Sequence, residues 1–217
     1  MTQLNCNQEI FHLENIYCVG RNYLAHIEEL QHRRDDEMLV FLKPNTSIAF
    51  EGQPIQLPHY SKEVHYEGEL VLLIGQDIPE GPIENPLAHI AGYALGVDLT
   101  ARDIQREVID KGQPWLKCKG FKQSALLSSF ICSQRLTALE NIHFTVELNG
   151  QLVQAGDTSQ MLYSIPEIIV YLQQRYGLKK GDIIYTGTPQ GVGRLCAGDQ
   201  LTLRLESDLL VAHFLIA

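Results

Sequence analysis

Apolar residues occur along this chain in short runs that alternate with polar and Gly-containing stretches. Two of these runs, residues 70–74 and 91–97, are apolar enough to predict buried strands. Residues 144–148 alternate between apolar and polar side chains, and Asn149-Gly150 after them is a type I′ hairpin signal. Further short strands are predicted at residues 16–19, 40–42, 55–57 and 151–153.

Three stretches favour helices. The first covers residues 22–30, and the second opens at a candidate N-cap, Thr100, and runs towards residue 109. The third begins with the capping box of Ser164 and Glu167, has Pro166 in its first turn, and should run to about Arg175. Strands and Gly-rich loops are expected from residue 181 onwards. Short strands outnumber helices without the regular alternation of a parallel α/β sheet, so we predict an α+β fold that is mainly β.

The chain has 217 residues and 45% hydrophobic residues, enough for one domain with a substantial core. It contains no internal repeat, low-complexity tract or linker-like segment. We therefore expect a single domain over residues 1–217, of which residues 1–15 form an N-terminal extension.

Charge and cysteine content narrow the function classes. The formal net charge is −9 and no Lys/Arg run could follow a nucleic-acid backbone, so a nucleic-acid partner is not expected. No apolar stretch approaches the length of a membrane span and the first residues lack a signal-peptide core, which predicts a cytoplasmic protein. The cysteines do not form a CxxC pair and are expected to be reduced thiols; they are Cys6, Cys18, Cys118, Cys132 and Cys196. Cys118 is expected to be a buried filler rather than a reactive group.

Two acidic residues head the apolar run at 70–74. Glu67 and Glu69 are two positions apart, so in a strand they share one face with Val71 and Leu73, with β-carbons about 7 Å apart. Two ionised carboxylates this close repel each other and resist leaving water, so they need a proton, basic neighbours or a cation. A divalent metal ion with oxygen ligands is the economical solution, and it predicts a third acid elsewhere.

Asp98 is the candidate for that third acid, because it ends a predicted buried strand just before a helix. The alternative for Asp98 is a residue that stabilises the helix N-terminus. The alternative for the glutamate pair is a solvated edge strand, which the four apolar residues 70–73 argue against.

His26 and Glu29 are a candidate proton-transfer pair, since residues three apart share a helix face and a carboxylate raises the basicity of a neighbouring histidine. A surface His–Glu pair is the alternative.

The Gly-rich segment 186–193 suits close approach of the backbone to a small ligand, or a tight structural loop. Lys119 lies in a lysine-rich segment for which a solvated basic loop is the ordinary interpretation.

Several motifs together closely resemble the fumarylacetoacetate hydrolase family, in its short single-domain form. They are Gly20-Arg21-Asn22-Tyr23 with His26 and Glu29, Phe41-Leu42-Lys43-Pro44, Tyr66-Glu67-Gly68-Glu69-Leu70, Gly92-Tyr93, Asp98-Leu99-Thr100-Ala101-Arg102-Asp103 with Gln105, Asn149-Gly150, and Thr186-Gly187-Thr188-Pro189. In order and spacing they are similar to acylpyruvate hydrolases and to the isomerase/decarboxylases of homoprotocatechuate breakdown. The resemblance covers residues 16–205.

This resemblance implies a mixed β-roll, a homodimer, and a Mg²⁺ or Mn²⁺ site made by Glu67, Glu69 and Asp98. It further implies that His26 and Glu29 act as a base pair on a lid segment and that Lys119 contacts the substrate. The residues that it places around the ligand are Arg102, Gln105 and Thr188.

The resemblance also implies the reaction, hydrolysis of a carbon–carbon bond in an acylpyruvate-type substrate such as fumarylpyruvate or acetylpyruvate through a metal-stabilised enolate. Decarboxylation of oxaloacetate, isomerisation/decarboxylation of a 2-hydroxymuconate-type diacid, and ligand binding without catalysis are the alternatives. One departure concerns the substrate: family members commonly have Lys-Ser-Phe-Asp and then Pro-Leu, where this chain has Lys119-Gly120-Phe121-Lys122 and Leu126-Leu127.

Overall fold

The computed structural model describes residues 2–30, 37–136 and 141–217. Its largest sheet is mixed and has the strand order β4-β3-β14-β7-β8-β10-β5, with β11 also paired to β8. The bounds are β3 Ile16–Gly20, β4 Leu39–Lys43, β5 Ile48–Phe50, β7 Gly68–Ile74, β8 Ile90–Asp98, β10 Ala125–Leu127, β11 Ile131–Cys132 and β14 Ile183–Tyr185. The β14–β3 and β10–β5 pairs are parallel, and the other pairs in this sheet are antiparallel.

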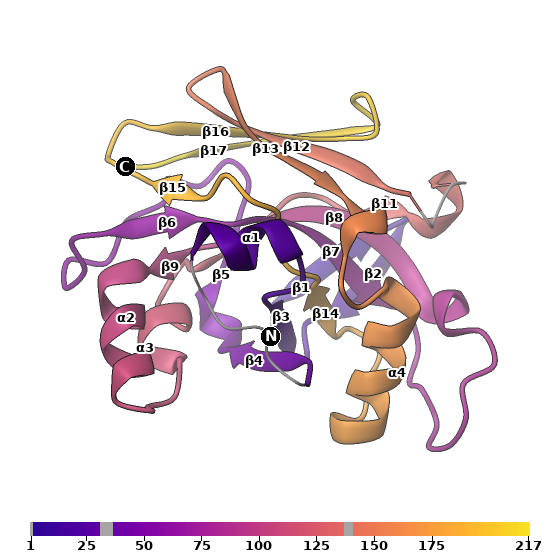
Figure 1. Cartoon of the computed structure of the whole chain (residues 1–217). Coiled ribbons are helices and arrows are strands. Elements are labelled where there is room, and N and C mark those ends of the chain that lie inside the picture. The colour runs from indigo at the N-terminus through magenta and orange to yellow at the C-terminus, as the bar shows by residue number, and fades with distance from the viewer. Residues whose placement is uncertain (1, 31–36, 137–140) are drawn as a thin grey trace.

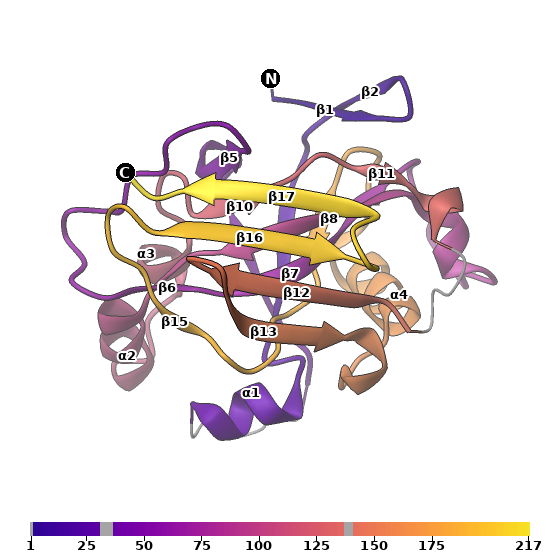
Figure 2. The same ribbon diagram turned by 90° about the horizontal axis from the view of Figure 1, so that it is seen from above.

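A four-stranded antiparallel sheet covers one face of the large sheet (Figures 1 and 2). Its strands, in spatial order, are β13 Gln151–Asp157, β12 His143–Leu148, β16 Gln200–Leu205 and β17 Leu210–Leu215. Leu70 and Leu72 of β7 belong to the core cluster that also holds Val146 and Leu203 of this second sheet. Val71 and Leu73 pack in a second cluster with the N-terminal residues. Because β7 is buried on both faces, its sequence is continuously apolar from Leu70 to Ile74.

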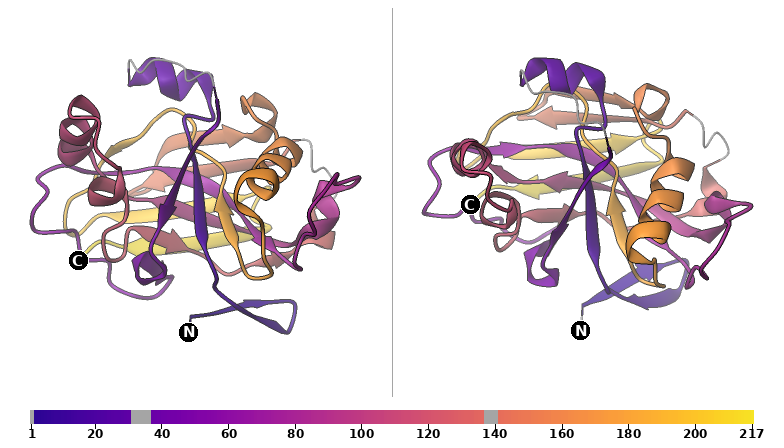
Figure 3. Two further views of the ribbon diagram at one scale, coloured as in Figure 1. Left: turned by 90° about the horizontal axis from the view of Figure 1, so that it is seen from below. Right: turned by 60° about the horizontal axis from the view of Figure 1, so that its bottom comes forward.

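A small third sheet, a terminal hairpin, four α-helices and four short 3₁₀-helices complete the described part of the chain. The third sheet has the order β15 Gly193–Arg194, β6 Val64–Tyr66 and β9 Thr100–Ala101, and the hairpin pairs β1 Gln3–Cys6 with β2 Glu9–His12. The helices are α1 Leu24–Glu29, α2 Arg102–Asp110, α3 Leu116–Lys119 and α4 Ile165–Tyr176. Figure 3 shows α2 and α3 on one side of strands β3 and β4, and α4 on the other. None of the helices in residues 2–30, 37–136 and 141–217 is long and apolar enough to cross a membrane.

The mainly-β α+β fold is confirmed, as are the strands at residues 16–19, 40–42 and 91–97. Asn149 and Gly150 have positive φ angles of 53° and 79°, as a type I′ turn requires. The predicted strand at residues 55–57 is wrong. Ile55 makes only an isolated parallel bridge with Ile216, because Pro54 has no amide hydrogen and Gln56 N donates to the Gln123 side chain at 3.0 Å.

The expected N-cap of α2 is also wrong. Ala101 precedes the helix, and Thr100 pairs in β9 while its hydroxyl donates to Asp98 O at 3.3 Å and accepts from Lys119 Nζ at 2.7 Å. A buried lysine is a stronger partner for this hydroxyl than a helix amide.

Candidate metal centre and active site

The three predicted acids meet where β7 begins and β8 ends. The two strands are antiparallel, and Glu69 lies opposite Gly96. Glu67 lies just before β7, and its backbone carbonyl accepts from Asp98 N at 2.8 Å. One carboxylate oxygen from each of Glu67, Glu69 and Asp98 lies within 4.8 Å of the others, and all three residues are buried. The register of one strand pair therefore assembles acids that are about thirty positions apart in the sequence.

Two basic side chains neutralise Glu67 and Asp98. Lys119 Nζ donates to Glu67 Oε2 at 2.7 Å and to Asp98 Oδ2 at 2.6 Å, and Arg102 donates to Glu67 Oε1. Burial alone would raise the pKa of Glu67, but the charges of Lys119 and Arg102 outweigh it and hold that pKa far below its usual value. The pKa of Lys119 is raised, because the charges of Asp98 and Glu67 outweigh the effect of burial. These two acids stay ionised inside the protein.

Glu69 has a different environment. Its Oε2 accepts a hydrogen bond from Gly187 N at 2.7 Å, and no ion pair of this residue is found in the described part of the chain. Burial, followed by the negative charges of Asp98 and Glu67, raises its pKa well above the usual range. Glu69 therefore needs a proton or a cation close to its carboxylate.

Asp98 is, after Glu69, the second acid that could bind a cation. Its Oδ1 is buried and accepts no hydrogen bond from the described residues, although Lys43 Nζ lies 2.7 Å away as an ion pair. That ammonium directs its hydrogen bonds to Leu99 O at 3.3 Å, Ser124 Oγ at 3.0 Å, and Lys119 O. The Glu69 carboxylate without an ion pair, next to an Asp98 oxygen that accepts no hydrogen bond from the described residues, gives a cluster of oxygen ligands that fits Mg²⁺ or Mn²⁺.

His26 and Glu29 lie on α1 and face each other, with His26 Nδ1 3.4 Å from Glu29 Oε2. His26 is 5% exposed, so the surface-pair interpretation does not describe it. Burial opposes ionisation of Glu29, but hydrogen bonds from His26 and from Gly191 N, the latter at 3.0 Å, lower its pKa. With Nδ1 engaged by a carboxylate, His26 Nε2 is the nitrogen left to exchange a proton with a ligand.

The Gly-rich loop binds an acid at each end. Gly187 and Gly191 have φ angles of +104° and +98°, and their amides donate to Glu69 and Glu29 respectively. A β-carbon on Gly191 would lie 2.0 Å from Val153 O, and one on Gly187 would lie 2.6 Å from the β-carbon of Asn22. Only glycine allows this close approach, so the loop positions one metal acid, Glu69, and one member of the histidine pair, Glu29.

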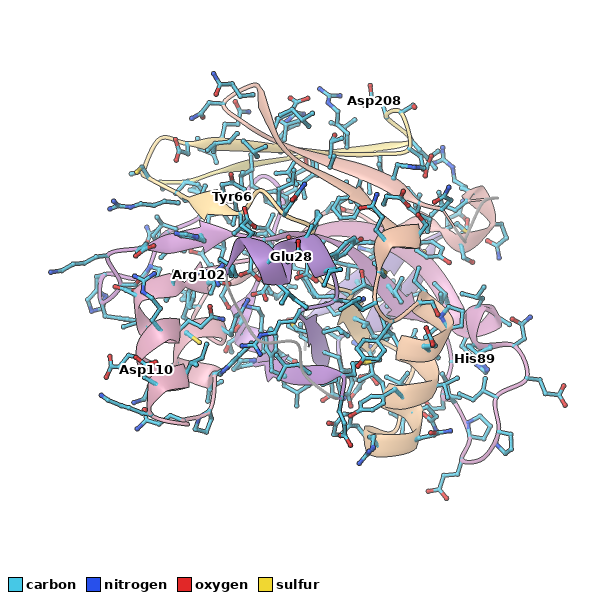
Figure 4. All side chains as sticks on the ribbon, viewed as in Figure 1. Glu28, Tyr66, His89, Arg102, Asp110 and Asp208 are labelled. Atoms are coloured by element: carbon cyan, nitrogen blue, oxygen red, sulfur yellow. The ribbon has the colours of Figure 1, made fainter. Side chains whose placement is uncertain are left out.

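One cavity joins these groups. Eight of the nine predicted site residues line it, namely His26, Glu67, Glu69, Asp98, Arg102, Gln105, Lys119 and Thr188. The ninth, Glu29, stands behind His26 and lines a neighbouring depression. Figure 4 shows Arg102 at the end of α2 nearest β6 and Asp110 at the far end, so the helix presents its first turn to the site.

Lys119 is not part of a solvated basic loop, since it is 2% exposed whereas Lys117 and Lys122 are exposed. Its three ammonium donors go to Glu67, Asp98 and Thr100, so in this structure they are committed to the acids. Direct contact of Lys119 with a substrate stays a prediction. The neighbouring Cys118 is buried, and burial raises the pKa of its thiol to about 11, as expected for an inert filler.

The sequence interpretation gave no role to three residues that complete the site. Lys43 pairs with Asp98, and Arg21 stacks its guanidinium 5.6 Å from the centre of the Trp115 ring at the cavity wall. Arg21 and Lys43 lie within motifs quoted for the family resemblance, which was the available signal. Trp115 had none beyond being the single tryptophan.

Comparison with known proteins identifies the family. The family model described as "Fumarylacetoacetate (FAA) hydrolase C-terminal" matches residues 15–211. The chain belongs to the fumarylacetoacetate hydrolase family.

Its relatives carry more than one activity. The chain is 41% identical to oxaloacetate tautomerase FAHD1, mitochondrial, of Bos taurus over 90% of this chain and 89% of the relative. It is 37% identical to oxaloacetate tautomerase YcgM of Escherichia coli over 94% and 93% of the two chains. The crystal structure of fumarylpyruvate hydrolase from Pseudomonas aeruginosa in complex with Mn²⁺ and pyruvate matches with a TM-score of 0.91 and 29% identity, covering 100% of this chain and 95% of that one.

Proposed function

We propose that this protein catalyses keto–enol tautomerisation of oxaloacetate, or of a closely similar 2-oxo dicarboxylate, with a divalent ion held by Glu67, Glu69 and Asp98. The observation that carries the proposal is the single cavity in which a buried histidine, backed by a carboxylate, faces three buried acids. The relatives named oxaloacetate tautomerase, which match nearly full length, support the choice of reaction. Hydrolysis of acylpyruvates, the reaction first expected from the motifs, becomes the second candidate.

The reaction requires one proton to leave carbon and one to reach oxygen. An ion bound by the three carboxylates would polarise the 2-oxo group and stabilise the enolate as it forms. His26 Nε2 takes the proton from the carbon next to the carbonyl, while Glu29 stabilises the imidazolium through Nδ1. The same proton is then delivered to the enolate oxygen, so His26 returns to its starting state and no water is consumed.

Substrate orientation is assigned to the rest of the cavity wall. Arg102 Nε is buried without a hydrogen-bond partner among the described residues, so it can donate to a ligand carboxylate. Gln105 accepts from Arg102 and lines the cavity, and Thr188 lines it from the Gly-rich loop. Lys119 and Arg102 keep Glu67 ionised and ready to bind the cation.

Acylpyruvate hydrolysis is the second candidate because the fumarylpyruvate hydrolase structure is so similar. In this reaction His26 would take its proton from water, and hydroxide would attack the distal carbonyl. Decarboxylation of oxaloacetate needs the same enolate stabilisation but no attacking water. All three reactions depend on the same acids, but His26 deprotonates carbon in tautomerisation and water in hydrolysis, whereas the loss of CO₂ in decarboxylation needs no base.

The test is a parallel assay of the Mg²⁺-loaded protein. Loss of the ultraviolet absorbance of the oxaloacetate enol should be accelerated, and His26→Ala should lower this rate by about 10²–10⁴-fold. Release of CO₂ from oxaloacetate and cleavage of acetylpyruvate and fumarylpyruvate are measured beside it. Faster turnover of the acylpyruvates would replace the proposal by the second candidate, and no effect on any substrate would overturn both.

Assembly completes the proposal. The family resemblance supports a homodimer, and the formal net charge of −9 argues against a nucleic-acid partner. Sedimentation equilibrium should give about twice the mass of the 24.5 kDa chain, and a monomer mass would contradict it.

A further inference from the structure

Lys43 is a fully buried cation that the proposed reaction does not use. Its side chain is 0% exposed and reaches the site from the edge strand β4, behind Asp98 rather than in the cavity wall. A buried ammonium is costly unless paired. Asp98 is thereby paired twice, since Lys43 lies 2.7 Å from one oxygen of its carboxylate and Lys119 lies 2.6 Å from the other.

The Lys43 ammonium determines the total charge of the buried cluster. The buried cluster contains three carboxylates and three cations, the latter being Lys43, Lys119 and Arg102. With all the acids ionised, these charges cancel, so a bound divalent ion would leave the site with two uncompensated positive charges. Two negative charges on the ligand would restore neutrality in a place where water cannot screen the excess.

We infer that Lys43 is a positioning residue that sets the charge of the metal-loaded site, so that the site selects dianionic ligands, the 2-oxo dicarboxylates, over monoanionic 2-oxo acids. The inference rests on the proposed function and names its substrate class. Lys43 acts through Asp98 and the cation beside it and does not touch the ligand. Its hydrogen bonds to Lys119 O and Ser124 Oγ fix the ammonium in that position.

Loss of the Lys43 charge should change two affinities in opposite directions. In Lys43→Met the repulsion between the ammonium and the metal ion is removed, so Mg²⁺ should bind about tenfold more tightly. The same variant has lost one positive charge from the loaded site, so its preference for oxalate over oxamate should fall about tenfold. Oxamate is the matched probe, since it replaces one carboxylate of oxalate by a neutral amide. Both affinities are measured by calorimetry and need no turnover.

Ser124→Ala is the control variant, because it removes one hydrogen bond of Lys43 and keeps every charge. It should leave the oxalate-to-oxamate ratio at the wild-type value. If Lys43→Met weakens Mg²⁺ and both anions together, Lys43 has only a structural role and the inference is overturned.

The wild-type protein provides a test that does not depend on folding of the variant. Its Mg²⁺-loaded form should prefer oxalate over oxamate at least about tenfold more strongly than Mg²⁺ does in water. An equal preference would overturn the inference even if the protein tautomerises oxaloacetate. Failure of the protein to bind Mg²⁺ would instead overturn the proposed function, so the two failures are distinguishable.

Discussion

At the residue scale, what each acid can do depends on its own partners. Glu67 and Asp98 are held ionised by basic neighbours, whereas Glu69 has only a backbone amide and a raised pKa. His26 is close enough to help lower the pKa of Glu67, but its own hydrogen bond goes to Glu29. Metal affinity and proton transfer should therefore respond to different substitutions.

We expect Glu69→Gln to weaken Mg²⁺ binding by at least about 10–100-fold, the range found for disturbed metal surroundings. The amide is nearly the same size but carries no charge for the cation. His26→Ala should leave Mg²⁺ affinity within a few-fold of wild type, because the imidazole is bonded to Glu29 and not to the acids. Titration calorimetry of the two variants checks both expectations. Equal affinities in wild type and Glu69→Gln would show that the three acids are not the ligands.

The glutamate pair was visible in the sequence because its signal is local, two acids beside an apolar run. The role of Lys43 was not, because its partners Leu99 and Ser124 lie 56 and 81 positions away. The same holds for Lys119, whose spacing in a basic segment suggested a solvated loop. Cations that reach a site from distant strands leave no periodic pattern, so only the family motifs marked them.

At the element scale, the elements predicted correctly are those with complete local signals. The capping box starts α4 at Ile165, and Asn149-Gly150 turns β12 into β13. The sequence interpretation missed the β1–β2 hairpin and the short strands β5, β10 and β11. Each of these elements has few residues. Except in the hairpin, each strand pairs with a strand far away in the chain, so neither periodicity nor turn residues predict it.

The capping box of α4 offers a pH-dependent test. Glu167 accepts from Ser164 N at 2.8 Å and from Ser164 Oγ at 2.6 Å, and these bonds lower its pKa. Stability from a lowered carboxyl pKa is present above the unfolded value, about 4.3, and is lost as the pH falls through the folded value. Glu167→Ala should cost about 0.5–2 kcal/mol near pH 7, and this difference should shrink on acidification.

Urea unfolding of wild type and Glu167→Ala at a series of pH values measures this difference. Glu167→Gln is the control, since its amide does not titrate in this range. A difference between Glu167→Ala and wild type that stays constant down to pH values below the folded pKa would contradict the assignment.

The Gly-rich loop provides the second test at this scale. Gly191→Ala would place a β-carbon 2.0 Å from Val153 O, so the loop must move and release Glu29. We expect a loss of stability of about 1–3 kcal/mol together with slower turnover. Gly198→Ala is the matched control, because Gly198 has a similar φ of +91° but open space around it. Comparable turnover losses in the two variants would show that backbone strain, and not displacement of Glu29, is responsible.

At the scale of the whole molecule, the site lies between strands whose partners extend across the large sheet. The acids come from the β7–β8 pair, Gly187 follows β14 on one side of β7, and Lys119 precedes β10 on the other side of β8. Repulsion among the acids is therefore concentrated at the centre of the fold. A cation that relieves this repulsion should stabilise the entire protein and not only the cavity.

Metal binding should accordingly raise the melting temperature in proportion to the logarithm of the free ion concentration. At 100 times the dissociation constant the gain is about 2.7 kcal/mol, which for a chain of this size corresponds to a shift of roughly 5–11 °C. Differential scanning calorimetry after chelation and after addition of Mg²⁺ or Mn²⁺ measures the shift. In Glu69→Gln the melting temperature should respond far less at the same ion concentration, since its cation affinity is weakened. A shift of the same size in that variant would mean that the stabilising ion binds elsewhere on the molecule.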